Sequence, residues 1–523
     1  GRVGNRPFEA ASNPCSLFFL PIRKVKFNSS YLVLPLMFAG TGSDVGKSII
    51  VTGLCRIFKQ DGYNPAPFKA QNMALNSYAT PDGFEIGRAQ AVQAEAAGIA
   101  CETDMNPLLL KPTGDCTSQV VLNGKPIGNT SARDYFRQDG RKFLADEVHK
   151  AYDRLSSRYN PIVLEGAGSI AELNLRHLDL VNMSMARYAG ARVIIVADID
   201  RGGVFASLYG SIMLQDDYDR KLIKGVIINK FRGDISLFDS GRKIIEEICG
   251  VPVLGVVPYL DDIHIDEEDS VALEGKSSSS GTGKVNVAVV KLRHISNFTD
   301  FNRLERDSRV NLYYTTSPEE LLNADIVIIP GTKSTIDDLA FLRESGLAAE
   351  IHDARNAGKT IFGICGGYQI MGTVISDPQG VEGKSITVQG LGLLPVSTML
   401  TGDKVTRQVD FNFLESNKNC KGYEIHMGRT EMTPGITPLN HLSDGSPEGC
   451  IVDNRCMGSY IHGILDNDCV VDYLLSPYSE ASDNGECGQD YVSWRESQYD
   501  ALAAALRKHI DIDAVYRIMN GDD

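Results

Sequence analysis

Two short stretches of this sequence place reactive side chains beside glycines that leave room for a ligand. The first stretch runs Gly40-Thr41-Gly42-Ser43-Asp44-Val45-Gly46-Lys47-Ser48, and it follows a short apolar run. In such a strand–turn–helix segment, backbone N–H groups point inward and cradle a phosphate, and the helix N-terminus adds partial positive charge. We expect Lys47 to neutralise the β- and γ-phosphates of a nucleotide and the Ser48 hydroxyl to ligate Mg²⁺.

The second stretch runs Gly363-Ile364-Cys365-Gly366-Gly367-Tyr368-Gln369, and it also follows an apolar run. A cysteine on a tight strand-to-helix turn exposes its sulfur, and such a turn accepts only small flanking residues. The helix N-terminus lowers the pKa of the thiol, so a thiolate nucleophile becomes accessible near neutral pH. A cysteine nucleophile needs a base, and the best candidate is His462 in Gly458-Ser-Tyr-Ile-His462-Gly463. We therefore predict Cys365 and His462 as catalytic residues.

Charged residues follow two further apolar runs. Glu165 comes directly after 162–164, and Asp200 and Arg201 come after 193–197. Ligands of open α/β sheets bind outside the carboxyl ends of the strands, so we expect these side chains near the phosphates. We predict Glu165 as a second Mg²⁺ ligand, and Asp200 and Arg201 as contacts to phosphate or substrate.

These residues need a scaffold of alternating strands and helices. Strand-length apolar runs lie at 34–38, 162–164, 193–197, 225–228 and 253–256, separated by helical patterns such as 86–97 and 141–155. Further runs lie at 285–290, 326–329 and 360–364, and a helical pattern covers 491–519. This alternation predicts an α/β fold, with parallel sheets covered by helices on both faces.

A Gly/Ser-rich stretch at 274–284 lacks apolar periodicity and predicts a flexible linker. It separates a first domain over 34–273, which carries the phosphate loop, from a second domain over 285–523, which carries Cys365 and ends in a helical tail. Residues 1–33 precede the first apolar run and are basic and acid-poor. We expect them to form a disordered N-terminal extension outside the fold.

Composition excludes several classes of protein. The 523 residues are 43% hydrophobic and 23% charged, which indicates a globular chain and not a disordered one. The formal net charge of −15 disfavours a nucleic-acid-binding surface. No apolar run reaches the roughly 18–20 residues of a membrane span. The 11 cysteines are scattered and odd in number, so we expect free thiols in a reducing, cytoplasmic compartment. Nothing in the sequence indicates an oligomeric state.

The phosphate loop departs from the standard P-loop, because its first glycine is Gly40 and Thr41 occupies the usual glycine position. With this shift and the segment Pro67-Phe-Lys69-Ala-Gln-Asn72, the first domain resembles the dethiobiotin-synthetase-like branch of P-loop proteins, which phosphorylate a carboxylate. The resemblance implies bound ATP, with Lys69 near the phosphates or the acceptor and Asn229 at the adenine edge. A GTPase-type Asn-Lys-x-Asp motif is excluded, because the fourth residue is Arg232.

The second domain resembles the class I glutamine amidotransferases over about 285–475, because an elbow cysteine is followed by a late histidine. This resemblance implies that Gln369 contacts bound glutamine, and that the N–H groups of Gly366 and of the loop around Gly331 bind the oxyanion. The family usually has a glutamate two residues after the histidine, but Ile464 stands there. Either the site is a Cys–His dyad, or another acid such as Glu424 orients His462. The segment 422–428 around Glu424 is too polar and glycine-framed for an ordinary strand, so we expect it to face the other domain or the substrate.

A carboxylate-activating ATP site and a glutaminase site in one chain together define a glutamine-dependent amide ligase. Several further segments resemble the cobyric acid synthase family of cobalamin biosynthesis, including 68–73, 85–90, 104–107, 110–113, 118–120, 200–207 and 229–234. The resemblance extends from about residue 36 to about residue 519. It implies ATP- and glutamine-dependent amidation of the b, d, e and g carboxylates of adenosylcobyrinic acid a,c-diamide, giving adenosylcobyric acid. The implied substrates are ATP with Mg²⁺, glutamine and a corrin polycarboxylate, with no nucleic acid or membrane as a partner.

Two alternatives remain at this stage. The related cobyrinic acid a,c-diamide synthases have the same two-domain plan and a different corrin acceptor. A partitioning-type P-loop ATPase with a vestigial glutaminase-like domain is an alternative from another class of protein. It predicts ATP turnover without glutaminase activity, and the intact Cys365, Gln369 and His462 argue against it.

Overall fold

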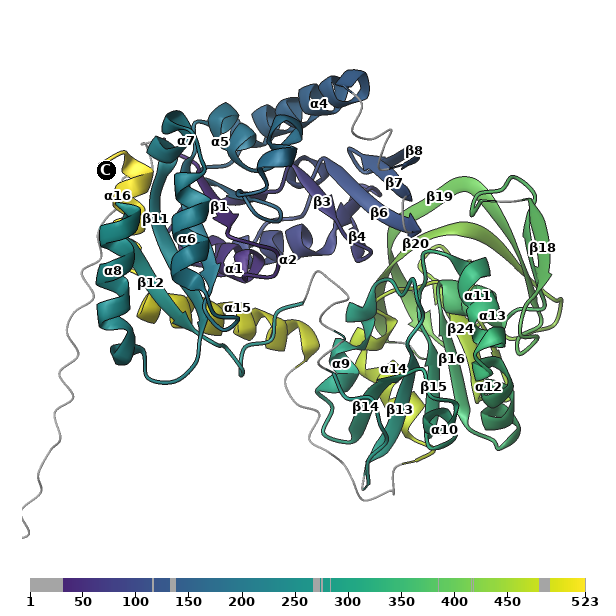
Figure 1. Cartoon of the computed structure of the whole chain (residues 1–523). Coiled ribbons are helices and arrows are strands. Elements are labelled where there is room, and N and C mark those ends of the chain that lie inside the picture. Colours follow the sequence, from purple (N-terminus) through teal and green to yellow (C-terminus); the bar gives the residue numbers. More distant parts are fainter. Residues whose placement is uncertain are drawn as a thin grey trace, which may run out of the picture. The chain divides into compact units, whose positions relative to one another are not determined.

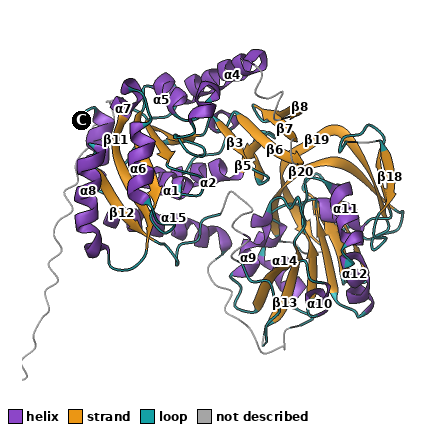
Figure 2. Ribbon diagram, viewed as in Figure 1, coloured by secondary structure: helices purple, strands orange, loops and turns teal. Residues whose placement is uncertain are grey.

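The computed structural model describes residues 32–522, apart from 115–116, 132–137, 267–272, 274–275, 283, 384, 415, 417 and 479–489. Residues from Leu32 to the C-terminus form one compact unit, so our expectation for the N-terminal extension lies almost wholly outside the described residues. Figures 1 and 2 show the helices and strands of this unit. In the described part of the chain, no helix is long and apolar enough to cross a membrane.

The first sheet is a six-stranded, fully parallel sheet in the order β12-β11-β10-β1-β9-β2. Its strands are β1 (Leu36–Gly40), β2 (Ala66–Phe68), β9 (Ile162–Glu165), β10 (Arg192–Asp198), β11 (Ile223–Phe231) and β12 (Val253–Pro258). Four of the five apolar runs predicted for this part of the chain lie within strands of this sheet, and the run at 34–38 overlaps β1, which begins at Leu36. The phosphate loop therefore follows a central strand, β1, between β10 and β9.

Alternate residues of the first sheet are buried on opposite faces, as the period of a β-strand requires. Met37 and Ala39 of β1 pack in one apolar cluster, and Leu36 and Phe38 pack in another. The first cluster includes residues from several helices, among them α4 (Gln138–Ser156), α5 (Met183–Ala189), α6 (Val204–Met213) and α8 (Asp239–Cys249). Both faces of the sheet are thus covered, as predicted for a parallel sheet.

The second face of this sheet is covered by α1 (Lys47–Gln60) together with the end of the chain. Leu502 and Leu506 of α15 (Tyr491–His509) pack beside Leu54 of α1, and Val515 of α16 (Ile512–Asn520) joins the same cluster. The predicted helical tail therefore exists, but it packs on the first sheet. We predict this tail as the end of the second domain, but its apolar residues pack on the first sheet.

The second sheet has the order β14-β13-β15-β16-β24-β23, and it is parallel except for its edge strand β23. Its strands are β13 (Val285–Val290), β14 (Val310–Thr315), β15 (Ile326–Ile329), β16 (Thr360–Ile364), β23 (Cys450–Val452) and β24 (Cys456–Ser459). The three apolar runs predicted after residue 284 coincide with β13, β15 and β16. The second sheet therefore confirms the predicted α/β class, and its strand β16 leads directly to Cys365.

Helices lie between or after the strands of the second sheet. These helices are α9 (Asn302–Glu305), α10 (Pro318–Leu322), α11 (Thr335–Glu344), α12 (Leu347–Asn356), α13 (Gly366–Met371) and α14 (Asp468–Leu475). The described residues of the predicted linker are bound to this part of the chain. Ser280 N–H donates to Glu320, and Gly281 N–H donates to Asn286, both at 2.8 Å.

A long antiparallel hairpin, β19 (Val396–Phe413) with β20 (Asn419–Met432), dominates a further sheet that also holds β17 (Val374–Asp377) and β18 (Ile386–Gln389). The segment 422–428 lies inside β20, so our expectation that it is not an ordinary strand is wrong. Its polar residues are tolerated because they have partners: Glu424 is buried and pairs with Arg407. Tyr423 and Ile425 pack with Ala79 in one apolar cluster, so the segment does face the other domain, as expected.

Smaller strands of the first half, by which we mean the residues before 274, complete the scaffold; the second half follows residue 284. A four-stranded sheet contains β3 (Gln71–Met73), β6 (Leu108–Gly114), β7 (Thr117–Leu122) and β8 (Lys125–Ser131), and β4 (Ser77–Ala79) pairs with β5 (Glu85–Gly87). Helix α2 (Arg88–Ala97) follows β5 directly. Tyr78 of β4 packs edge-on against Tyr423 of β20, with ring centroids 4.6 Å apart, so these strands reach the second half.

Candidate active sites

The phosphate loop needs glycine where side chains approach its backbone. Gly46 has a φ of 90°, and a Cβ there would lie 2.1 Å from the Asn229 amide nitrogen. A Cβ on Gly40 would lie 2.7 Å from the Lys47 ammonium. The Lys47 ammonium donates to the carbonyl oxygens of Gly42 and Gly168, at 2.9 and 3.2 Å. The lysine is thus held across the loop, where it faces the space that phosphates occupy in such a turn.

Glu165, at the end of β9, receives three hydrogen bonds within the first half. Its Oε1 accepts from the Ser48 hydroxyl at 2.8 Å and from Lys69 Nζ at 3.0 Å, and its Oε2 accepts from Gln93 at 2.5 Å. Burial alone would raise the pKa of Glu165, but the Lys69 charge and these hydrogen bonds lower it. The structure therefore brings together Ser48, Lys69 and an ionised Glu165, as the sequence predicted.

The Ser48–Glu165 pair fits a magnesium ion by the chemistry of its donors. Mg²⁺ prefers hard oxygen ligands and is bound in proteins by one or two side chains together with substrate phosphates and water. A hydroxyl and a carboxylate beside a phosphate loop supply such ligands. Among the described residues, no group of three or more His, Cys, Asp or Glu side chains forms an all-protein metal site.

Residues after β10 and β11 lie beside the phosphate loop. The Asn229 side-chain N–H donates to the Val45 carbonyl at 2.9 Å, and Lys230 pairs with Asp198 at 3.0 Å. Arg201 is two-thirds exposed and lies 3.9 Å from Asp44, at the edge of the cavity described below. Asp200 instead accepts from Arg232 at 2.8 Å. Arg201 is thus placed to meet a ligand, whereas the Asp200 carboxylate is already paired.

A cavity of about 1340 Å³ opens from the phosphate loop. Lys47, Ser48, Lys69 and Glu165 line one part of it. Sites for a single drug-sized ligand are about 300–1,000 Å³, so this cavity is large enough for a nucleotide and part of a second substrate.

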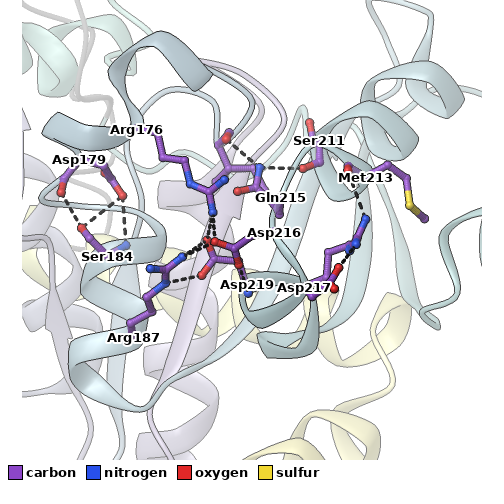
Figure 3. A network of polar contacts seen from close by, with 12 residues as sticks. Arg176, Asp179, Ser184, Arg187, Ser211, Met213, Gln215, Asp216, Asp217 and Asp219 are labelled. Atoms are coloured by element: carbon purple, nitrogen blue, oxygen red, sulfur yellow. Dashed lines mark hydrogen bonds and ion pairs between the residues drawn. The ribbon is translucent and has the colours of Figure 1, made fainter.

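One wall of this cavity is the segment that leads into α5, and a network of ion pairs holds it in place (Figure 3). Arg176 of this wall donates to Asp216 at 2.5 Å and to the buried Asp219 at 2.7 Å. Arg187 of α5 binds the same two carboxylates. The wall is therefore anchored to α7 (Asp217–Leu222) by two arginines that share two aspartates.

Cys365 lies on a strained turn between β16 and α13. Its backbone has φ 51° and ψ −108°, a conformation that is rare for residues other than glycine. Its neighbours leave no room for side chains: a Cβ on Gly367 would lie 1.9 Å from the Ile329 carbonyl, and one on Gly366 would lie 2.6 Å from Thr332. The turn has the strained, glycine-framed geometry expected of a nucleophile elbow, with Cys365 at the N-terminus of α13.

His462 is fully buried beside Cys365 and is held by Asp300. The His462 Nδ1 lies 2.7 Å from Asp300 Oδ2, and Asp300 Oδ1 accepts from the Gly463 N–H at 2.9 Å. Burial lowers the pKa of His462, but the negative charge of Asp300 and the interaction with Cys365 raise it to about 10. Since Nδ1 faces Asp300, the other ring nitrogen is left for Cys365. The arrangement is a Cys–His–Asp triad.

The orienting acid was left open by the sequence, and the structure places Asp300 there. The alternative with Glu424 is wrong, because Glu424 pairs with Arg407 instead. The dyad alternative is also not what the structure contains. Asp300 lies in a polar segment shortly after β13, the strand beside β15 in the second sheet. The only feature of the sequence that indicates Asp300 is its position after a buried strand. In the family motif the acid is expected two residues after the histidine, and that position does not indicate Asp300.

The predicted glutamine contacts surround the same turn. Gln369 is buried, accepts from the Thr335 hydroxyl at 3.0 Å and donates to the Tyr460 hydroxyl at 3.1 Å. Gly366 and Gln369 both line a second cavity of about 280 Å³, together with Cys365 and His462. Gly331 lies beside the base, because a Cβ there would be 3.2 Å from the His462 ring. The structure thus brings the predicted residues of this site together.

Residues of the first half also line the second cavity, and the sequence did not predict their contribution. These residues are Lys111 and Gln119, from β6 and β7, and they line the cavity together with Lys333 and Lys404. Lys333 donates to Gln119 at 3.0 Å. The buried Glu85 pairs with Lys111 at 2.7 Å and also with Lys404. Burial, together with Lys404 and Lys111, lowers the pKa of Lys333 to about 7.

Comparisons with known proteins assign both halves of the chain to known families. A model of the CobQ/CobB/MinD/ParA nucleotide binding domain matches residues 36–271, and a model of the CobB/CobQ-like glutamine amidotransferase domain matches residues 286–470. A protein named cobyric acid synthase from Phocaeicola vulgatus is 64% identical over 94% of this chain and 99% of its own length. Proteins of the same name are 63% identical in Bacteroides fragilis, over 94% of this chain and 99% of their length, and 56% identical in Parabacteroides distasonis, over 92% and 98%. The chain therefore belongs to the cobyric acid synthase family and is a glutamine-hydrolysing amide ligase.

Proposed function

We propose that this enzyme amidates the b, d, e and g side-chain carboxylates of adenosylcobyrinic acid a,c-diamide, with ATP and glutamine, to give adenosylcobyric acid. The observation that carries the proposal is a Cys–His–Asp arrangement together with a phosphate loop whose Ser48 binds Glu165, in one compact unit. The chain is also 64% identical to a protein named cobyric acid synthase. All three substrates are small molecules.

In the glutaminase reaction, the Cys365 thiol gives its proton to His462 and attacks the side-chain amide carbon of glutamine. The N–H groups of Gly366 and of the loop at Gly331 bind the oxyanion. His462 then returns the proton to the leaving nitrogen, which departs as ammonia and leaves a thioester on Cys365. Water hydrolyses the thioester to glutamate, with His462 again as base. The raised pKa of His462 suits the first proton transfer.

At the phosphate loop, a corrin carboxylate attacks the γ-phosphorus of ATP, and ADP leaves. Lys47 and the backbone N–H groups of the loop compensate the charge on the transferred phosphoryl group. Ser48 and Glu165 would hold Mg²⁺, which neutralises phosphate charge when it is bound. Asn229 would lie at the adenine edge, and Lys69 would lie between Glu165 and the acceptor. Ammonia attacks the acyl phosphate, and phosphate leaves the new amide.

The proposal is tested by a time course of ATP, Mg²⁺, glutamine and adenosylcobyrinic acid a,c-diamide with the full-length enzyme, followed by mass spectrometry. Each exchange of a hydroxyl for an amino group lowers the mass of the corrin by one unit. We expect four successive decreases. No decrease with the diamide, together with two decreases from corrin that lacks the a and c amides, would assign the enzyme to a,c-diamide synthesis instead.

A further inference from the structure

The large cavity is lined at a second place by residues far from the phosphate loop in sequence. Phe298, Asn302 and Arg306 of the second half line it, and so does Trp494 of the C-terminal helix α15. The lining of the cavity therefore includes the phosphate loop and Glu165 and also a flat indole ring and a guanidinium group.

Arg306 has no acid partner within the described part of the chain, in contrast to three other cations of this cavity. Lys69 pairs with Glu165, Lys230 with Asp198 and Lys276 with Glu305. Among the described residues, no carboxylate lies within 4 Å of the Arg306 guanidinium, and its buried Nη1 has no hydrogen-bond partner. The uncharged Tyr491 side chain is its polar neighbour.

The acids nearest to Arg306 are already used by other groups. Asp266 pairs with Arg88 at 2.6 Å and accepts from Asn302 at 2.8 Å, and Glu305 pairs with Lys276 at 2.7 Å. Burial lowers the pKa of Arg306, against the smaller opposite effects of Tyr491, Asp266 and Glu305. A largely buried cation without a counter-ion is costly for a fold, and a bound anion would remove that cost.

The guanidinium is also held in a fixed orientation. Its central carbon lies 3.5 Å from the centroid of the Trp494 ring, and Tyr491 stacks on Trp494 with centroids 5.8 Å apart. Stacking on an aromatic face leaves the edge of the guanidinium free, and that edge matches a carboxylate with two parallel hydrogen bonds. The indole beside it offers flat apolar surface to a ring system.

We propose that Arg306, stacked on Trp494, binds a carboxylate of the amidation acceptor, a macrocycle with several carboxylate side chains. The inference rests on the proposed function and adds a second attachment point to it. One carboxylate reacts at the phosphate loop, while another is held at Arg306 in the same cavity. Because the chain carries a net charge of −15, attraction of an anionic acceptor must come from such local cations.

The attachment has a consequence for successive amidations. Each turnover converts one carboxylate of the acceptor to a neutral amide, so fewer groups remain that Arg306 can bind. Binding of the starting diamide should therefore depend on Arg306 more strongly than binding of the final product, which has gained four further amides.

The test compares wild-type enzyme with Arg306→Gln and Arg306→Lys, in acceptor titrations with adenosylcobyrinic acid a,c-diamide. A hydrogen-bonded charge pair is worth about 10–100-fold in binding. We expect Arg306→Gln to raise the KM for the diamide by at least about tenfold, with Arg306→Lys in between. The KM for ATP and the rate of glutamine hydrolysis should stay within about twofold. The control Arg429→Gln removes a guanidinium that is 73% exposed, and it should change none of these values.

A binding measurement separates affinity from catalysis. Trp494 is the only tryptophan of the chain, so quenching of its fluorescence reports acceptor binding without turnover. Arg306→Gln should weaken binding of the diamide about as much as it raises the KM for the diamide. It should weaken binding of the final product, which has gained four further amides, less. An unchanged KM for the diamide in Arg306→Gln would overturn the inference, as would an equal loss for ATP and the diamide. A wild-type enzyme that does not amidate the diamide at all would instead overturn the proposed function.

Discussion

Asp300 Oδ2 lies 2.7 Å from Nδ1 of His462, although the two residues are 162 positions apart in the sequence. The aspartate follows the first strand of the second sheet, and the histidine follows β24 of the same sheet. The contact fixes the orientation of the imidazole, and it leaves the other ring nitrogen for Cys365. The family motif would place the acid two residues after His462, but here the acid follows a different strand. In either position the carboxylate can orient the imidazole.

Replacing Asp300 tests this relationship. Asp300→Asn keeps the shape of the side chain but removes the charge that favours the protonated imidazole. We expect the rate of glutamine-dependent amidation to fall by about 10²–10⁴-fold, because the tautomer and orientation of His462 are no longer fixed. Amidation with a high concentration of ammonium should remain near the wild-type rate. Equal loss with both nitrogen sources would contradict a role confined to the glutaminase site.

The two sites should be separable by mutation. Cys365→Ala removes the nucleophile, so glutamine-dependent amidation should disappear while ammonium-dependent amidation continues. Lys47→Ala removes the charge that compensates the phosphoryl group, so both activities should disappear. Product formation by mass spectrometry checks both variants. If ammonium does not rescue Cys365→Ala, the division of labour between the two sites is incorrect.

The contribution of the His462–Asp300 pair to the stability of the protein should depend on pH. Asp300 and Cys365 raise the pKa of His462 to about 10, against burial, which lowers it. A group whose pKa is raised by folding stabilises the folded state fully below its unfolded pKa of about 6.5, and this contribution is lost as pH rises through about 10. A Cys365→Ala background removes thiol titration and also the part of the raised pKa that Cys365 causes, so the loss should begin at a lower pH. The Tm difference caused by Asp300→Asn in this background should still be largest near pH 6.5 and fall as pH rises. A difference that grows toward pH 10 would show that the histidine is not held as a cation.

Glu85 pairs with Lys111 of the first half and with Lys404 of the second half, and its removal should be costly. Its side chain is fully buried, and Lys111 and Lys404 are each about one-twentieth exposed. Glu85→Gln leaves two buried ammonium groups without their shared carboxylate, a change that typically costs about 3–5 kcal/mol. We expect a large drop in the urea midpoint of unfolding, whereas Glu431→Gln on the exposed surface of β20 should have little effect. A midpoint for Glu85→Gln equal to that of the control would contradict the account of this cluster.

Local patterns in the sequence predicted much of the fold. The apolar runs before and after the Gly/Ser-rich stretch were strands, because a strand buried on both faces must be almost continuously apolar. The phosphate loop and the cysteine elbow were also predictable, since each chemistry needs glycines at fixed spacing from the reactive residue. Ser48, Lys69 and Glu165 could be linked because all three lie at one edge of one parallel sheet.

Contacts between distant segments were not predictable. Asp300 has no glycine frame or fixed spacing from His462, so nothing local marks it as the orienting acid. Polar residues in β20 obscured a strand that belongs to a hairpin and not to a parallel sheet. The C-terminal helices have an apolar face, but the sequence does not tell which sheet that face covers. Arg306 and Trp494 become neighbours only because α15 returns to the first sheet.

The central claim is that nitrogen released at Cys365 becomes the amide nitrogen formed at the phosphate loop. The most direct measurement supplies the enzyme with glutamine labelled with nitrogen-15 in its side-chain amide, together with ATP, Mg²⁺, the a,c-diamide and unlabelled ammonium in the buffer. Mass spectrometry of the corrin product then shows the source of each new nitrogen. We predict nitrogen-15 in all four new amides of the product. A product that carries only the unlabelled nitrogen of the buffer would contradict the claim.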